Sequence, residues 1–137
     1  MSRRNHTHFR SERGQAAVEF ALVAPLLFAL LLGILQAGIA FHNYITVTDA
    51  ARAAARKAVT ARVAGVTADD VTTAAQNAAG DLDPAKLGVA LADPSDPTFS
   101  QAGSTLTVTV TYPYSINVLG WSVASGNLTS RMTERLE

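Results

Sequence analysis

Apolar residues form one unbroken run near the start of the chain. Between Phe20 and Phe41 no residue is charged, and Gln36 is the only one whose side chain can form hydrogen bonds. At the α-helical rise, a helix over this run is about 33 Å long, against a hydrocarbon thickness of about 30 Å. A core helix of a small soluble domain has a polar face, and this run has none. The run therefore predicts a transmembrane helix, which we assign to residues 15–41.

An alanine-rich amphipathic pattern follows the apolar run as far as about residue 64. Its apolar side chains share one helical stripe, while most of its basic residues lie off that stripe. The stripe consists of Ala50, Ala51, Ala54, Ala55, Ala58, Val59 and Val63. We expect the helix to continue out of the membrane and to be interrupted at Gly65. Thr67 is then the predicted N-cap of a second, short helix that stops at Gly80.

Alternation of apolar and polar residues predicts strands in the C-terminal part of the chain. It is clearest over residues 104–112, where valine, leucine and tyrosine alternate with threonine, and Pro113 is expected to end this strand. Residues 87–91 and 128–136 alternate in the same way. The predicted fold is therefore α+β. A long N-terminal transmembrane helix extends into an extracytoplasmic amphipathic helix, followed by a second short helix and a small antiparallel sheet of about three strands that covers the helical spine.

The connection between the last two predicted strands, residues 114–123, is unusually apolar. Its large side chains include Tyr114, Ile116 and Trp121. One interpretation is a surface that touches a partner subunit or the membrane interface, where tryptophan and tyrosine are favoured. The alternative is a further strand folded into the core.

Composition narrows the function to a structural role. The 137 residues are enough for one domain and a membrane anchor, and there is no cysteine for a disulfide or a thiolate metal site. Net charge is zero, which argues against a nucleic-acid partner. The sequence also lacks a phosphate-binding loop, a metalloprotease motif and a serine nucleophile motif. We therefore expect no enzymatic activity, no cofactor, no metal and no small-molecule substrate.

The N-terminal end of the apolar run carries an isolated carboxylate. A basic leader, with Arg3, Arg4, Arg10 and Arg13, ends at Gly14, and Glu19 stands at the head of the run. A carboxylate that enters lipid is costly unless it is paired. If the chain is cut after Gly14, the new α-amino group of Gln15 lies one helical turn from Glu19 and can pair with it, within one subunit or between neighbours.

Small residues recur every four positions along the predicted span. Such a row lets a second helix approach closely in lipid, although a chain this rich in alanine also produces such rows by chance. The row consists of Ala17, Ala21, Pro25, Ala29, Gly33 and Ala37. Pro25 also frees the carbonyl group of Ala21, which favours a local kink.

These N-terminal residues resemble a known processing site. Gly14 followed by Gln15, with Glu19 and Phe20 as fifth and sixth residues after the cut, resembles the site in type IV prepilins. The string Arg-Gly-Gln-Ala-Ala-Val-Glu-Phe-Ala-Leu-Val-Ala-Pro-Leu-Leu, residues 13–27, resembles the TadE-like family of the tight-adherence (Flp) pilus systems. The resemblance implies a minor pilin-like (pseudopilin) subunit that a prepilin peptidase cuts after Gly14. Its implied partners are the membrane, other pilin-like subunits and pilus assembly platform proteins.

This interpretation divides the chain into a basic leader at 1–14, a transmembrane helix at 15–41 and an extracytoplasmic pilin-like domain at 42–137. Basic residues occur on both sides of the span, but the leader set lies closer to it, so we place the N-terminus in the cytoplasm and the protein in the inner (cytoplasmic) membrane. Two alternatives remain open. One is a secreted protein whose signal peptide is cleaved near Ala40, within Gly38-Ile39-Ala40. The other is an unprocessed single-pass membrane-anchored binding module.

Overall fold

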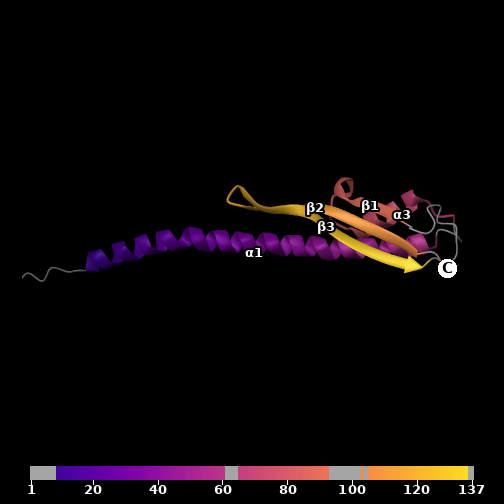
Figure 1. Ribbon diagram of the computed structural model, residues 1–137. Helices are drawn as coiled ribbons and strands as arrows, with labels where there is room; N and C mark the ends of the chain where they lie inside the picture. Colours follow the sequence, from indigo (N-terminus) through magenta and orange to yellow (C-terminus); the bar gives the residue numbers. More distant parts are fainter. Residues whose placement is uncertain (1–8, 61–64, 93–102, 104, 136–137) are drawn as a thin grey trace, which may run out of the picture.

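A long helix forms the axis of the molecule. The computed structural model describes residues 9–60, 65–92, 103 and 105–135. Helix α1 (Phe9–Val59) is 51 residues long and continues through Pro25. Its C-terminal half carries the folded domain, whereas its N-terminal half projects beyond that domain (Figure 1).

A short helix packs against the C-terminal half of α1. Helix α3 (Ala68–Ala78) begins at Thr67, whose side-chain oxygen accepts a hydrogen bond from the backbone N–H of Asp70. The backbone N–H and the hydroxyl of Thr67 donate in return to the Asp70 carboxylate, each over 2.8 Å. These bonds, the backbone one first, hold the pKa of Asp70 below its ordinary value. The predicted N-cap is therefore confirmed, and it forms a complete capping box.

The helix α3 ends as the sequence predicts. Gly80 follows the C-cap residue Ala79 and has a φ of 57°, a left-handed conformation that glycine adopts without strain. A single 3-10 turn, η1 (Pro84–Lys86), then leads into the first strand.

Three strands form an antiparallel sheet in the order β1-β2-β3. Strand β1 (Gly88–Ala92) pairs with β2 (Thr105–Val118), which in turn pairs with β3 (Trp121–Arg135). The sheet lies along α1, and β2 and β3 extend beyond β1 as a two-stranded hairpin that runs back toward the N-terminal half of the helix (Figure 1).

The core lies between α1, α3 and the sheet. The alanines that α1 contributes are Ala50, Ala51, Ala54, Ala55 and Ala58, all at most 1% exposed. Helix α3 contributes Val71 and Ala75, and β2 contributes Leu106, Val108 and Val110. Small side chains on α1 let α3 and the sheet approach closely, so the predicted alanine stripe is confirmed as the helical side of the core.

Two predictions about this region are wrong. Pro113 does not end a strand, because β2 continues through it to Val118. Beyond Thr111 the strand has only β3 as a neighbour, so the missing N–H of proline breaks no ladder hydrogen bond on the open side. The connection expected at 114–123 is instead the end of the β2–β3 hairpin, so the alternative of further strand structure is confirmed, but these residues are not part of the buried core. Val63, Leu136 and the loop expected at 93–103, apart from Gly103, lie outside the described residues.

Candidate membrane span and processing site

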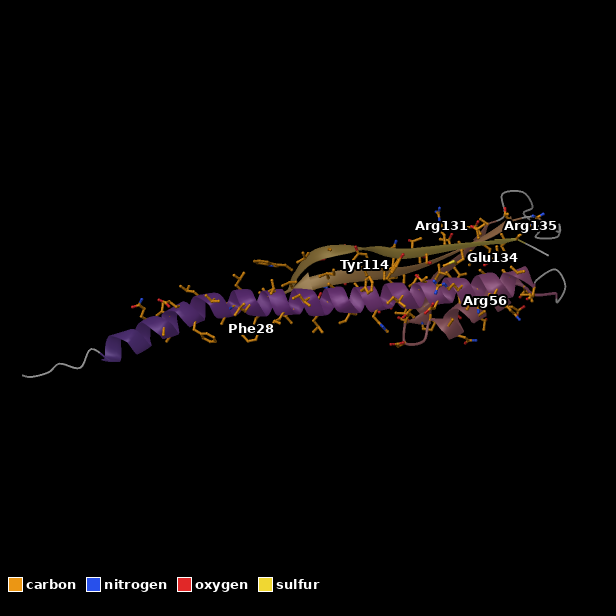
Figure 2. All side chains as sticks on the ribbon, turned by 90° about the horizontal axis from the view of Figure 1, so that it is seen from below. Phe28, Arg56, Tyr114, Arg131, Glu134 and Arg135 are labelled. Atoms are coloured by element: carbon orange, nitrogen blue, oxygen red, sulfur yellow. The ribbon has the colours of Figure 1, made fainter. Side chains whose placement is uncertain are left out.

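The N-terminal half of α1 is covered by almost nothing else in the described chain. Large apolar side chains on all sides of the helix are exposed, among them Phe20 at 69%, Leu26 at 71% and Phe41 at 67%. Figure 2 shows side chains projecting from the helix all around Phe28. Among the described residues, α1 alone is long and apolar enough to cross a bilayer. Exposing this surface to water is unfavourable, so its length and composition fit a lipid environment.

The predicted processing site lies on the first turns of this helix. Gly14, Gln15, Glu19 and Phe20 are all exposed, and an added Cβ atom at Gly14 meets no atom within 4 Å. The Gln15 side-chain amide donates a 3.1 Å hydrogen bond to the Glu19 carboxylate. Glu19 is therefore bonded to the residue one helical turn before it. A cut after Gly14 would free the α-amino group of that same residue, Gln15. The leader residues Arg3 and Arg4 lie outside the described residues.

The row of small residues lies on the same uncovered part of α1. Ala17, Ala21, Pro25 and Ala37 are exposed, and Ala29 and Gly33 are half-buried. Added Cβ atoms at Gly33 and Gly38 meet no atom within 4 Å. Within this subunit, packing against other elements therefore does not require the glycine at either position.

The polar residue near the C-terminal end of the apolar run has a partner in the sheet. The side-chain amide of Gln36 donates to the backbone carbonyl of Asn117, and its oxygen accepts from the backbone N–H of the same residue. This two-point contact joins α1 to the β2–β3 hairpin across 81 residues of sequence. It makes Gln36 a structural residue of the span, a role the sequence pattern does not reveal.

A groove separates the hairpin from the helix next to this contact. Its volume is about 400 Å³. The residues that line it are Gln36, Ile39, Ala40 and Asn43 of α1, and Pro113, Tyr114, Ser115 and Asn117 of β2. The groove is open to the outside, and its lining includes no charged side chain, which excludes a site for charge recognition.

The first ionisable residue on α1 after the apolar run also contacts the folded domain. His42 Nε2 lies 3.6 Å from the Asp81 carboxylate, and both side chains are largely exposed. Asp49 and Arg52 form an exposed ion pair about two turns further on, as their spacing suggests. Contacts between ionisable side chains therefore begin where the apolar run ends.

The three residues singled out in the apolar connection lie in different surroundings. Tyr114 is half-buried, and its ring lies over Gly126 of β3, where an added Cβ would be 3.2 Å from Tyr114 Cε1. Ile116 is also half-buried, whereas Trp121 is 80% exposed. Leu119 and Val123, which the sequence pattern does not single out, are as prominent, at 65% and 67% exposed.

These features define a class of protein. A single apolar helix near the N-terminus suggests a single-pass membrane protein, and its extension is the spine of a small α+β domain. Of the described residues, none form a group of three or more histidine, aspartate or glutamate side chains arranged to hold a metal ion.

A family model matches part of the same helix. Residues 14–56 match the model of the family described as TadE-like protein, so the TadE-like resemblance is confirmed over this segment. The match fits a pilus-associated protein of the tight-adherence systems. Comparisons with curated proteins and with solved structures gave no match.

Proposed function

We propose that this chain is a minor pilin-like (pseudopilin) subunit of a tight-adherence pilus or a related secretion system. A prepilin peptidase removes the leader after Gly14, and the mature protein stays in the inner membrane with its sheet on the extracytoplasmic side. The observation that carries this proposal is the arrangement at the head of α1. Glu19 is exposed at the start of an uncovered apolar helix and is bonded to residue 15, within a segment that matches the TadE-like model.

The Glu19 carboxylate can form an ion pair with the α-amino group that cleavage would free at Gln15. An α-amino group has an ordinary pKa of about 8, so the freed terminus at Gln15 is positively charged at neutral pH. Pairing this charge with Glu19 of the same or a neighbouring subunit lowers the cost of placing the carboxylate at the lipid boundary. Pairing between subunits would also set their relative positions along the helix axis, which is what assembly on a platform requires.

The uncovered row of small residues supports the same proposal. Helices in lipid associate through close packing, because lipid chains offer no hydrophobic driving force between them. We therefore propose that Ala17, Ala21, Pro25, Ala29, Gly33 and Ala37 face the span of another pilin-like subunit. Within the described part of the chain, Ala17, Ala21, Pro25 and Ala37 are exposed and Ala29 and Gly33 are half-buried, so most of the row is accessible.

The intact mass of the protein isolated from its native host tests the proposal. A chain that begins at Gln15 is expected. A chain that begins at Phe41 would support secretion instead, and an uncut leader would support a simple anchor; either result overturns processing after Gly14.

Two matched glycine variants sharpen this experiment. Gly14→Leu is expected to block cleavage, whereas Gly38→Leu is expected to leave it intact. Both positions are on α1, and an added Cβ atom at either meets no described atom within 4 Å, so the two variants are matched in their local surroundings. If cleavage instead depends on Gly38 and not on Gly14, a signal peptidase acts near Ala40 and the pilin-like proposal fails.

A further inference from the structure

The end of the β2–β3 hairpin lies beside the apolar half of α1. We define the hairpin tip as residues 118–123, and its turn is formed by Leu119 and Gly120. Asn117, one residue before the tip, is bonded to Gln36, which lies inside the uncharged run from Phe20 to Phe41. In Figure 1 the tip lies over the N-terminal half of the helix, away from the rest of the sheet. The tip therefore lies at the level of the predicted span.

The depth of the tip follows from element geometry. Phe41 ends the apolar run, and Gln36 lies five residues before it, or about 7.5 Å along the helix. Two or three further residues of strand carry the tip about 7–10 Å beyond Asn117. The tip is then about 15 Å from the outer end of the run, which is about half of the hydrocarbon thickness.

The surface of the tip suits lipid and not water. Leu119, Trp121 and Val123 are 65%, 80% and 67% exposed, which is costly for large apolar groups in water. No residue from Pro113 to Ser130 is charged. Charges on β3 begin only at Arg131, toward the other end of the hairpin (Figure 2). Apolar exposure and absence of charge thus coincide on the part of the sheet that lies along the span.

The turn at the tip holds an apolar side chain in a backbone conformation that is costly for it. Leu119 has a φ of 52° and Gly120 a φ of 87°, the signs required by the tight turn of a two-residue hairpin. Asparagine, aspartate and glycine adopt the left-handed conformation readily, whereas leucine does so at a cost. Leucine at this position therefore carries a conformational cost, which an apolar contact of its exposed side chain would offset.

One backbone position next to the tip has both of its hydrogen-bonding groups satisfied by α1. β1 pairs with β2 only as far as Thr111, so the outer edge of β2 has no neighbouring strand beyond it. Backbone groups left unpaired in lipid are costly. Gln36 satisfies both backbone groups of Asn117 on that edge, next to a register shift between Ile116 and Asn117.

From these observations we propose that the hairpin tip inserts into the outer leaflet of the bilayer beside its own transmembrane helix. The protein then contacts the membrane at two places, through the span and through Leu119, Trp121 and Val123. Such a second anchor fixes the rotation of the domain about the helix axis and its height above the membrane. The inference rests on the membrane span of the proposed function, but not on cleavage after Gly14.

Trp121 is the sole tryptophan of the chain, so its fluorescence tests the inference directly. Full-length protein is reconstituted in phosphatidylcholine–phosphatidylglycerol vesicles with and without lipids brominated on the acyl chain. We expect blue-shifted emission that acyl-chain bromines quench strongly. Red-shifted, unquenched emission would overturn the inference, and so would blue-shifted emission without quenching, since that places Trp121 against protein, such as a second copy of the chain.

Two relocated tryptophans separate failure of this inference from failure of the span. In the Trp121→Phe background, a Phe28→Trp variant reports on the span and a Glu134→Trp variant reports on the far end of the sheet (Figure 2). We expect quenching for Phe28→Trp and none for Glu134→Trp. If Phe28→Trp is quenched but wild-type Trp121 is not, the span stands and the hairpin inference is wrong. If neither is quenched, both are wrong.

A turn variant separates lipid contact from simple folding. Leu119→Asn suits the left-handed turn better than leucine and so favours the hairpin, but it removes an apolar group from the tip. We expect bromine quenching of Trp121 to fall in this variant while the domain stays folded. Unchanged or stronger quenching would mean that Leu119 serves the turn and not a membrane contact.

Discussion

The side chain of Gln36 pairs with both backbone groups of Asn117 and so ties the hairpin to α1 within the apolar run, five residues before Phe41. We predict that Gln36→Leu loosens the hairpin in a membrane, because it leaves a donor and an acceptor of Asn117 without partners. Each unsatisfied buried group costs about 1–3 kcal/mol. Hydrogen exchange of the Asn117 amide, measured in nanodiscs, is expected to speed up. Ile34→Leu, an exposed neighbour on the same helix, is the control and should leave that exchange unchanged.

This contact also marks the limit of what the sequence reveals. The span, the alanine stripe, the Thr67 cap and the strands at 88–92 and 105–112 follow from periodicity and local residue preferences, which act over a few residues. A bond between residues 81 positions apart leaves no periodic signal. The amide of Gln36 therefore stands out in the sequence only as an exception in an apolar run.

The hairpin escaped prediction for a different physical reason. Proline, as at Pro113, is not typical of a strand interior. The pair Leu119–Gly120 is not typical of a tight hairpin turn, where asparagine or aspartate before glycine is the usual signal. The structure accommodates Pro113 because that edge of β2 has no neighbouring strand. It accommodates Leu119 in a left-handed conformation that local preference disfavours. Alternation from Tyr114 to Val118 was the available signal for a longer strand.

The charge of Glu19, and not only its hydrogen bond, is expected to matter for assembly. Glu19→Gln can still accept a hydrogen bond from Gln15 but cannot form an ion pair with a freed α-amino group. We predict normal insertion and normal cleavage after Gly14, with reduced incorporation into pilus or secretion complexes, because the ionic partner is lost.

The measurement compares the amount of each variant in the membrane with the amount recovered in complexes from the native host. Glu19→Asp keeps the charge and should retain more incorporation than Glu19→Gln. Equal incorporation of Glu19→Gln and wild type would remove the charge from the mechanism.

The capping box at Thr67 and Asp70 predicts a pH dependence of domain stability. The folded-state pKa of Asp70 is lowered from its ordinary value of 3.8, chiefly by the backbone hydrogen bond from Thr67. The carboxylate therefore stabilises the domain above pH 3.8, and this contribution is lost as the pH falls through the lowered folded value. Thermal unfolding of the wild type and of Asp70→Asn should differ at neutral pH and converge in acid. A difference that persists in strong acid would mean that the side chain acts through packing and not through its charge.

If the span associates with another helix through its row of small residues, leucine substitutions at two glycines of α1, Gly33 and Gly38, should have different effects. Gly33 belongs to the row at every fourth position, while Gly38 lies about 140° around the helix from Gly33 and about 100° from Ala37. An added Cβ atom at either position meets no atom of the described subunit within 4 Å, and leucine raises helix propensity by a similar amount at each. If a second helix packs on the row, Gly33→Leu separates the two backbones and weakens association, whereas Gly38→Leu does not. Crosslinking of full-length protein in native membranes, followed by the yield of crosslinked complexes, measures the difference. Equal yields for the two variants would show that the row reflects alanine-rich composition and not a helix interface, since a change of bulk or hydrophobicity alone affects both positions alike.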